Sequence, residues 1–271
     1  MKNLYLADLQ PGMLPAQTIY DAKGLILIAR GVPLTDSYIK RLVKFNIQTV
    51  AIQDTETENS YATVFSPIAD QAATKARQLL ADLVKHKTIK LEPTSYQIEQ
   101  VVYSALERLP LQPYLAKMCQ NDTLYNHSLR TALISANLGL AKNYDYLNLD
   151  FLVTCCILHD CGMGSDFYED PNHTHAFKGF LEIRNQTSLD ILTALVCLQH
   201  HERFDGLGTP LGFAKYQIIE FARLIAVADY YDRLVAIHHN TPRQAIFKLA
   251  AGSGSLFDPD MIKLFESILI T

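Results

Sequence analysis

The sequence predicts a mainly α-helical protein with a small N-terminal α+β module and a C-terminal helical bundle. From Pro67 onward, apolar residues recur at three- and four-residue steps, which is the period of an amphipathic helix. Residues 1–55 instead alternate short apolar runs with Gly and Pro turn signals, as short strands do. Because 49% of the residues are apolar and only 19% are charged, the chain can bury a substantial core.

The N-terminal module is expected to contain short strands and one helix. Apolar runs at 25–28 and 47–52 are each preceded by turn-forming or polar residues, which favours strands. Thr35 can cap a helix over residues 36–45, since its hydroxyl can accept a hydrogen bond from a free backbone N–H. Residues 1–55 therefore form an α+β module without a cluster of catalytic side chains.

A linker and two helices are expected next. Residues 54–65 begin with polar residues and lack periodicity, which is typical of a linker. Helical periodicity follows over 70–85 and 95–109. We therefore predict three parts: the module at 1–55, a linker with helices at 56–110, and a helical domain at 111–271.

The helical domain is expected to contain seven helices, near 122–141, 147–159, 174–184, 188–201, 216–238, 242–250 and 259–269. Several begin at recognisable caps. Thr241 and Asp258 each precede a Pro, which suits the first helical position because Pro lacks the N–H that would be unsatisfied there. Ser188 can cap the helix that ends at His200-His201.

Charge and hydropathy exclude several partners. The chain has 24 basic and 28 acidic residues and no basic run, so duplex nucleic acid is not expected as a partner. No apolar stretch reaches the length of a membrane span, and Asp8 interrupts the N-terminus before a signal-peptide core could form. We expect a cytoplasmic protein without a membrane association.

The helical domain carries side chains that could bind metal ions. Imidazole suits zinc, iron, manganese or copper, and a carboxylate can bridge two cations. Gathered by folding, these donors could hold two ions about 3.5–4 Å apart. A single buried His is more often a hydrogen-bonded core residue, so the joint occurrence supports the prediction. The donors are His127, His159, Asp160, His175, His200, His201 and Asp229.

Asp160 is the most informative of these donors. The strongly apolar residues 151–158 precede His159-Asp160, so a buried helix would end there with a charge at its tip. Burying an unpaired carboxylate costs on the order of several kcal/mol. Asp160 therefore needs a cation, which is either a basic side chain or a metal ion.

Five sequence blocks occur in a specific order and spacing between residues 120 and 271. They are His127-Ser128-Leu129-Arg130, Leu158-His159-Asp160-Cys161-Gly162, His175 followed by Gly179, the run from His200 to Pro210, and the run from Ala226 to Asp232. These blocks resemble the HD-GYP subgroup of the HD-domain metal-dependent phosphohydrolases. Residues 1–55, with Pro11-Gly12-Met13 and Gly31, resemble the small module often found ahead of such domains.

The resemblance implies a role for each donor. His127, His159 and Asp229 would hold one ion, His175, His200 and His201 would hold the second, and Asp160 would bridge them. The implied cofactors are two divalent ions, iron or manganese, with zinc or nickel also suited. The implied reaction is hydrolysis of cyclic di-GMP or a related phosphodiester by a hydroxide that bridges the metals, with His159 and Asp160 as catalytic residues.

The chain departs from the family pattern around this site. Thr123 stands where members with a third metal have Glu, and Met163 stands where the family has a phosphate-binding Lys. Gly208-Thr209-Pro210 replaces Gly-Tyr-Pro, and residues 237–243 replace a basic segment. Arg203 and Lys178, with Thr209, are the residues we predict to bind substrate, although the two basic residues are equally well explained as solvated surface charges.

Two other functions stay open. A degenerate HD-GYP protein could bind metals and a nucleotide, or a protein signalling partner, with little or no turnover, and the departures at Met163, Thr209 and His238 motivate this alternative. In the other, the histidines are structural and the bundle is a metal-free interaction domain.

Overall fold

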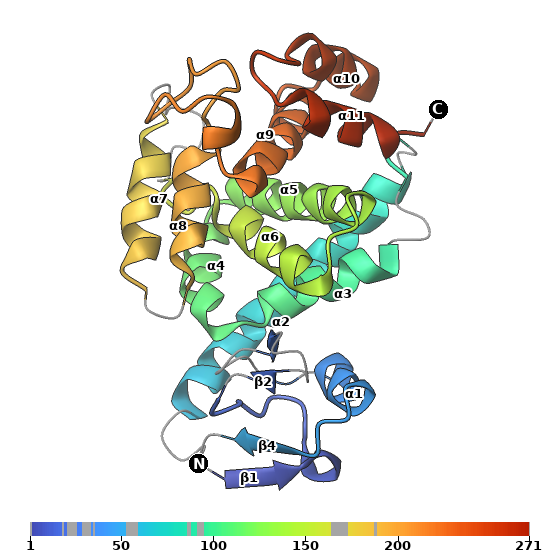
Figure 1. Ribbon diagram of the computed structural model, residues 1–271, viewed down its shortest axis with the longest axis vertical. Coiled ribbons are helices and arrows are strands. Elements are labelled where there is room, and N and C mark those ends of the chain that lie inside the picture. Colours follow the sequence, from blue (N-terminus) through green and yellow to red (C-terminus); the bar gives the residue numbers. More distant parts are fainter. Residues whose placement is uncertain are drawn as a thin grey trace. The chain divides into compact units, whose positions relative to one another are not determined.

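The structure is a computed structural model, and it describes residues 2–17, 19–20, 26–28, 34, 36–52, 59–85, 88–90, 95–163, 173–186 and 189–270. It confirms the mainly α-helical fold class with a small N-terminal α+β part (Figure 1). The chain divides into two compact units: residues 1–71 with 106–112, and residues 72–105 with 113–271. This division falls inside a helix rather than in the predicted linker.

The N-terminal unit contains two small antiparallel sheets and a helix. Strand β1 (Lys2–Tyr5) pairs with β4 (Thr49–Ile52), and β2 (Ile19–Tyr20) pairs with β3 (Ile26–Ile28). Helix α1 (Asp36–Lys44) and β3 and β4 match the elements predicted from the sequence. Thr35 and Gly31 lie outside the described residues. The buried apolar side chains of this unit are contributed mainly by leucines, which include Leu9, Leu14, Leu27, Leu34 and Leu42.

Helix α2 (Asn59–Lys85) begins inside the segment predicted to be a linker. That prediction is wrong over residues 59–65, while residues 54–58 lie outside the described part of the chain. Local propensity is a weak guide here, because a helix propagates cooperatively from an adjoining segment with a strong apolar period.

The second unit is a helical bundle whose remaining helices are α3 (Ser95–Leu106), α4 (Gln112–Met118), α5 (Asp122–Ala141), α6 (Tyr146–Leu158), α7 (Thr174–Arg184), α8 (Ile191–Gln199), α9 (Glu220–Asp232), α10 (Pro242–Ala251) and α11 (Pro259–Ser267). The 3-10 turns at Leu6–Asp8 and Leu109–Leu111 belong to the N-terminal unit, and the one at Lys215–Gln217 belongs to the second. A π-helical turn at Arg233–Ile237 follows α9.

The predicted caps are partly confirmed. The Thr241 hydroxyl accepts a hydrogen bond from Gln244 N, and the Asp258 carboxylate accepts one from Asp260 N. The predicted helix at 188–201 is shorter, because Asp190 caps it by accepting a hydrogen bond from Leu192 N at 2.8 Å. Ser188 lies outside the described residues.

Two more predicted helices end or begin elsewhere. The helix expected over 95–109 ends at Leu106, and a 3-10 turn that contains Pro110 follows it. The helix expected over 216–238 starts at Glu220, because Ile218 and Ile219 have extended backbone, and it changes to the π-helical turn at Arg233.

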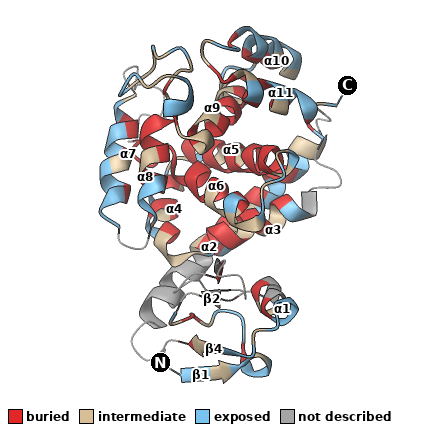
Figure 2. Ribbon diagram, viewed as in Figure 1, coloured by how far each residue is buried: buried red, intermediate tan, exposed pale blue. Residues whose placement is uncertain are grey.

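Helices α5 and α6 form the centre of this unit, and both are largely buried (Figure 2). Leu129, Leu133 and Leu138 of α5 and Leu152 and Ile157 of α6 are almost completely buried. Each such side chain stabilises the fold by roughly 1.5–3 kcal/mol on transfer from water. A helix that is apolar on all sides belongs in a core. Because both helices are held in place by this packing, the residues at their ends also have fixed positions.

Helices α7 and α8 lie side by side and cover one end of the core (Figure 1). Their close approach depends on glycine. A Cβ at Gly179 would lie 2.5 Å from the sulfur of Cys197 on α8, and a Cβ at Gly162 would overlap the carbonyl oxygen of His175. The absence of these Cβ atoms allows α7 to pack against the turn after α6.

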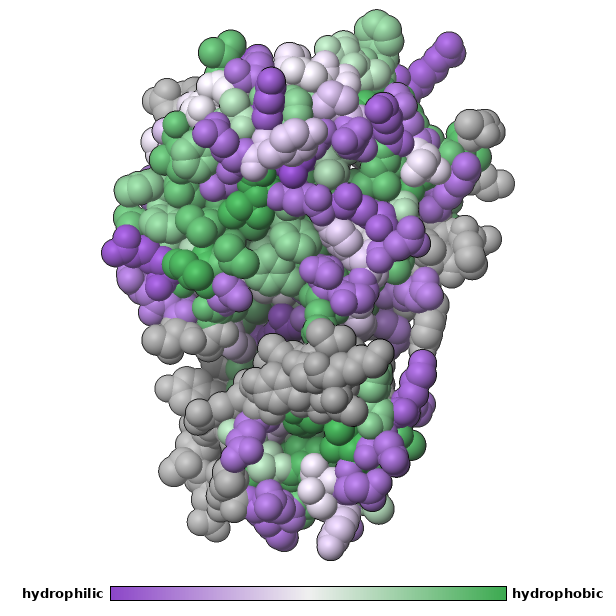
Figure 3. Space-filling model, in the orientation of Figure 1, coloured by the Kyte–Doolittle hydropathy of each residue, from purple (hydrophilic) through white to green (hydrophobic). Residues whose placement is uncertain are grey.

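The surface of the second unit mixes hydrophilic and hydrophobic residues on the face seen in Figure 3. Among the residues that the structure describes, no helix combines the length and the apolar character needed to cross a bilayer.

Candidate metal centre

The structure brings together all seven donors that the sequence singled out. His127 lies on α5, His175 in the first turn of α7, and Asp229 near the end of α9. His159 and Asp160 follow α6 directly, and His200 and His201 follow α8 directly. Because apolar helices fix these positions, the donors meet at the helix ends in two groups that share Asp160.

The first group contains His127, His159, Asp160 and Asp229, with ligand atoms within 4.8 Å of one another. His127 Nε2 is 2.8 Å from Asp229 Oδ1 and 3.6 Å from Asp160 Oδ2. His159 Nε2 is 3.4 Å from Asp160 Oδ2 and 3.7 Å from Asp229 Oδ1. All four residues are buried. Such spacings suit an ion about 2.0–2.2 Å from each donor.

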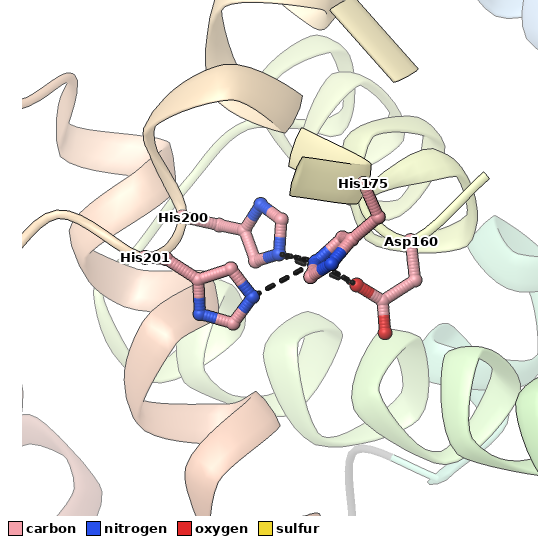
Figure 4. Close-up of side chains that lie close together, drawn as sticks. All are labelled: Asp160, His175, His200 and His201. Atoms are coloured by element: carbon pink, nitrogen blue, oxygen red, sulfur yellow. Dashed lines mark hydrogen bonds and ion pairs between the residues drawn. The ribbon is translucent and has the colours of Figure 1, made fainter. Parts of the chain in front are cut away.

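The second group contains Asp160, His175, His200 and His201, and its imidazoles point toward one another (Figure 4). His175 Nε2 and His200 Nε2 are 3.1 and 3.3 Å from Asp160 Oδ1. His201 Nε2 is 2.9 Å from His175 Nε2. Asp160 therefore turns Oδ2 to the first group and Oδ1 to the second, as a carboxylate between two ions would.

Two of the imidazoles, those of His159 and His200, have the tautomer that a metal ligand needs. His159 Nδ1 lies 2.6 Å from the carbonyl oxygen of Cys156, and His200 Nδ1 lies 2.6 Å from that of Cys197. A carbonyl can only accept a hydrogen bond, so each Nδ1 carries the proton and each Nε2 presents a lone pair. His159 Nε2 is buried and has no hydrogen-bond partner among the described residues, so the donor set fits a cation.

Asp232 and Arg130 orient His127, and sequence reasoning assigned neither of them a role. His127 Nδ1 donates to Asp232 Oδ2 at 2.7 Å, and Arg130 donates to both oxygens of Asp232 at 2.6 and 3.0 Å. A carboxylate behind a ligand imidazole fixes its ring and its tautomer. The signal was present in the sequence, because Asp232 follows Asp229 by three residues on the same helix.

Arg233 is the second feature that the sequence did not reveal. Its Nε donates to Asp229 Oδ1 and its Nη2 donates to Asp160 Oδ2, both at 2.7 Å. The side chain is 21% exposed and stands at the start of the π-helical turn. Asp160 is therefore paired with a basic side chain, which is one of the two kinds of cation predicted for it from the sequence.

The two groups differ electrostatically. Burial lowers the pKa of His127, but hydrogen bonds to Asp229 and Asp232 outweigh it and raise the pKa to about 8. Burial lowers the pKa of His200 to about 4, and burial with the charge of His200 lowers the pKa of His201 as well. Burial opposes ionisation of Asp160, yet neighbouring His159 and Arg233 hold its pKa well below the usual range.

A cavity of about 530 Å³ opens beside these donors, which is within the usual range for a small-molecule site. Ligand residues of both groups line it, and its other walls include Met163, Arg203, Tyr230, Arg233 and Phe257. The buried Met163 gives the cavity an apolar wall where a lysine would give a charge.

The three predicted substrate-binding residues lie in different places. Arg203 lines the cavity, but its guanidinium donates to Asp205. Among the described residues, Lys178 and Thr209 are not part of the cavity wall. Lys178 is exposed on α7, and Thr209 N donates to His201 O at 3.3 Å.

Glu202 is a further residue whose role became visible only in the structure. It is buried directly after His201, and its two carboxylate oxygens accept hydrogen bonds from Leu211 N at 2.6 Å and Phe213 N at 3.0 Å. Glu202 thereby ties the following loop to the end of α8, next to the second group.

Comparison with known proteins agrees with this geometry. Residues 124–234 match the HD domain family model, and this part of the chain is an HD domain. The chain is 37% identical over 98 residues to a cyclic di-GMP phosphodiesterase from Pseudomonas aeruginosa, over 34% of this chain and 23% of that protein. It is 43% identical over 70 residues to the cyclic di-GMP phosphodiesterase response regulator RpfG from Xanthomonas campestris, over 24% of this chain and 18% of that protein.

A solved structure shows the same fold. An HDG"Y"P protein from Bdellovibrio bacteriovorus matches with a TM-score of 0.51 and 16% identity over 98% of each chain. Together, the family match over residues 124–234 and the two curated relatives confirm the predicted resemblance to HD-GYP proteins, and the solved structure agrees in fold. The matches span less than a quarter of each of these two curated relatives, 23% and 18% of their lengths.

Proposed function

We propose that the chain is a metal-dependent phosphodiesterase that hydrolyses a cyclic dinucleotide, with cyclic di-GMP first, or a related phosphodiester. The observation that carries the proposal is the pair of buried ligand groups joined through Asp160 beside a cavity of about 530 Å³. The similar proteins from Pseudomonas and Xanthomonas, which are named cyclic di-GMP phosphodiesterases, support the substrate class.

His127, His159 and Asp229 would hold one divalent ion, His175, His200 and His201 would hold the other, and Asp160 would bridge them. Iron or manganese suits this set of imidazoles and carboxylates. Ions held there would act as Lewis acids that lower the pKa of a water molecule and stabilise negative charge on a phosphoryl group.

The chain's own residues would position the substrate. The carbonyl oxygens of Cys156 and Cys197 keep His159 and His200 in the tautomer that a ligand needs. The rings of Tyr230 and Phe257, 5.1 Å apart between centroids, line the cavity and can contact a nucleobase. Arg203 at the cavity wall would contact a phosphate on leaving Asp205, while roles for Lys178 and Thr209 remain predictions.

A second candidate function is nucleotide or partner binding with little turnover. Two observations favour it: Met163 gives the cavity an apolar wall, and Arg233 is engaged by two of the carboxylates. Loss of a charge-assisted contact to a phosphate costs about 1.5–3 kcal/mol, which would slow a phosphodiesterase or change its ligand.

The experiment is hydrolysis by protein loaded with Mn²⁺ or Fe²⁺ under anaerobic conditions. Cyclic di-GMP, other cyclic dinucleotides and an aryl phosphodiester are the substrates, and Asp160→Ala is the inactive control. Multiple turnovers that disappear in Asp160→Ala support the first function. Tight nucleotide binding, measured by calorimetry, without turnover supports the second function. If elemental analysis finds no bound metal after loading, both functions are contradicted.

A further inference from the structure

The first group already contains a positively charged side chain. We propose that Arg233 is a resident cation that competes with a metal ion for Asp160 and Asp229. The wild-type protein then holds one divalent ion tightly in the second group, and a second ion binds the first group only when Arg233 leaves these carboxylates. This inference rests on the proposed function only in assuming that both groups can bind metal.

The geometry places the guanidinium and an ion on the same atoms. Arg233 binds Asp229 Oδ1 and Asp160 Oδ2, each at 2.7 Å. These are the oxygens that face the imidazoles of the first group, since Asp229 Oδ1 is 2.8 Å from His127 Nε2 and Asp160 Oδ2 is 3.4 Å from His159 Nε2. An ion among these donors would share both oxygens with a positive charge that is already bound.

Charge balance separates the two groups further. Asp160 and Asp229 contribute two negative charges, and Arg233 cancels one of them, while Asp232 is balanced by Arg130. With neutral imidazoles, one divalent ion changes this net charge from −1 to +1, and a second raises it to +3. Uncompensated like charges at such distances repel strongly in a buried site.

The second group has a different environment. Asp160 Oδ1, which faces it, contacts the imidazoles of His175 and His200. An ion in this group is therefore separated from the guanidinium by the Asp160 carboxylate, which binds Arg233 through Oδ2. The second group is the one that Arg233 leaves available.

Arg233 also has a place to move to. It lines the cavity beside the centre, its side chain is 21% exposed, and it begins a π-helical turn, a feature that is frequent at functional sites. An anionic phosphodiester in this cavity would attract the guanidinium. The same movement would release both carboxylates to a second ion, so Arg233 is a positioning residue that couples metal loading to phosphate binding.

The test measures metal affinity and stoichiometry rather than turnover. Arg233→Met removes the charge and keeps a long side chain, Arg233→Lys restores a positive charge, and Arg203→Ala removes an arginine from the same cavity wall as the control. Each purified protein is stripped of metal, titrated with Mn²⁺ by calorimetry, and checked by elemental analysis.

We expect one tight Mn²⁺ ion per chain in wild type, Arg233→Lys and Arg203→Ala, and two in Arg233→Met. In Arg233→Met, the second ion should bind at least about tenfold more tightly than in wild type, which corresponds to about 1.4 kcal/mol. If wild type and Arg233→Met each bind two ions with the same affinities, Arg233 does not compete with a metal ion, and the proposed function is left intact. Failure of every protein to bind Mn²⁺ would overturn both.

Electron paramagnetic resonance tests the proposal on the wild-type protein alone, so the result does not depend on the folding of a variant. At one equivalent of Mn²⁺ and at moderate excess, the spectrum should be that of an isolated ion. The spectrum of a magnetically coupled pair at one to two equivalents would contradict the proposal. Adding the aryl phosphodiester should convert the isolated signal into a coupled one as Arg233 turns to the phosphate.

Discussion

The first and second ligand groups share one carboxylate and differ in almost everything around it. In the first group, Asp232 holds His127 and Arg233 binds both carboxylates. In the second group, three imidazoles surround Asp160 Oδ1, and all three line the cavity. Two sets of similar ligands can thus differ in affinity because of the charges behind them rather than because of the donors themselves.

The shared carboxylate gives the largest expected effect. Asp160→Asn keeps the shape of the side chain but removes the charge from both groups, so we expect loss of all tight metal binding and an at least about thousandfold lower rate of hydrolysis. Elemental analysis and a phosphodiester assay would measure these. Asp145→Asn, an exposed cap that Asn can replace, is the control and should change neither quantity. Full metal content in Asp160→Asn would contradict a shared bridge.

A change in packing should damage the second group selectively. In Gly179→Ala, the new methyl group meets the Cys197 sulfur at 2.5 Å, so α7 and its His175 must shift relative to α8. We expect the free energy of unfolding to fall by about 1–3 kcal/mol, as overpacking typically costs, and the tight ion to bind more weakly. Chemical denaturation and calorimetry measure both. The neighbouring exposed Lys178→Ala should change neither, and an unchanged Gly179→Ala would show that the helices tolerate a wider separation.

Asp232 should matter to the first group alone. Asp232→Asn replaces the carboxylate that orients His127 with a neutral amide, and the loss of such a partner typically costs about 10–100-fold in metal affinity. The measurement is made in the Arg233→Met background, where the first group is free to bind. We expect the affinity of the first group to fall and that of the second to stay within about twofold. Equal weakening of both groups would contradict their independence.

The pH dependence of metal binding should also distinguish the groups. Hydrogen bonds to Asp229 and Asp232 raise the pKa of His127 to about 8 with Arg233 in place, and loss of the Arg233 charge, which lowers this pKa, should raise it further. Because His127 must lose a proton to bind an ion, affinity at the first group should fall about tenfold for each pH unit below about 8. His200 has a pKa of about 4, so it stays neutral and its group should keep its ion down to about pH 5. Calorimetry on Arg233→Met between pH 5 and 9 would show two separate dependences, and parallel curves would be the contrary result.

The sequence predicted much of the fold and the identity of the clustered donors. Strong apolar periodicity located α5, α6 and α7, and the pairs His159-Asp160 and His200-His201 stood out because they end buried segments. Helix ends were less predictable. The α8 cap is Asp190 and α2 extends into a polar stretch, since capping and helix extension depend on neighbouring structure as well as on local composition.

The residues behind the ligands were not predictable in the same way. Asp232 shares a helix face with Asp229, and that spacing was visible, but its contact with His127 requires α5 and α9 to pack together. Arg233 follows Asp229 by four residues, a spacing that favours an ion pair on a helix and was visible in the sequence, but its contact with Asp160 requires α9 to pack against α6. The sequence left open whether Asp160 would meet a basic side chain or a metal ion, and the geometry points to both.

The most direct measurement is anomalous X-ray diffraction from crystals soaked with Mn²⁺, for wild type and Arg233→Met. We expect a peak within coordination distance of His175, His200, His201 and Asp160 in both proteins. Arg233→Met should show a second peak among His127, His159 and Asp229. Crystals of both proteins without an anomalous peak beside Asp160 would contradict a metal centre at this site.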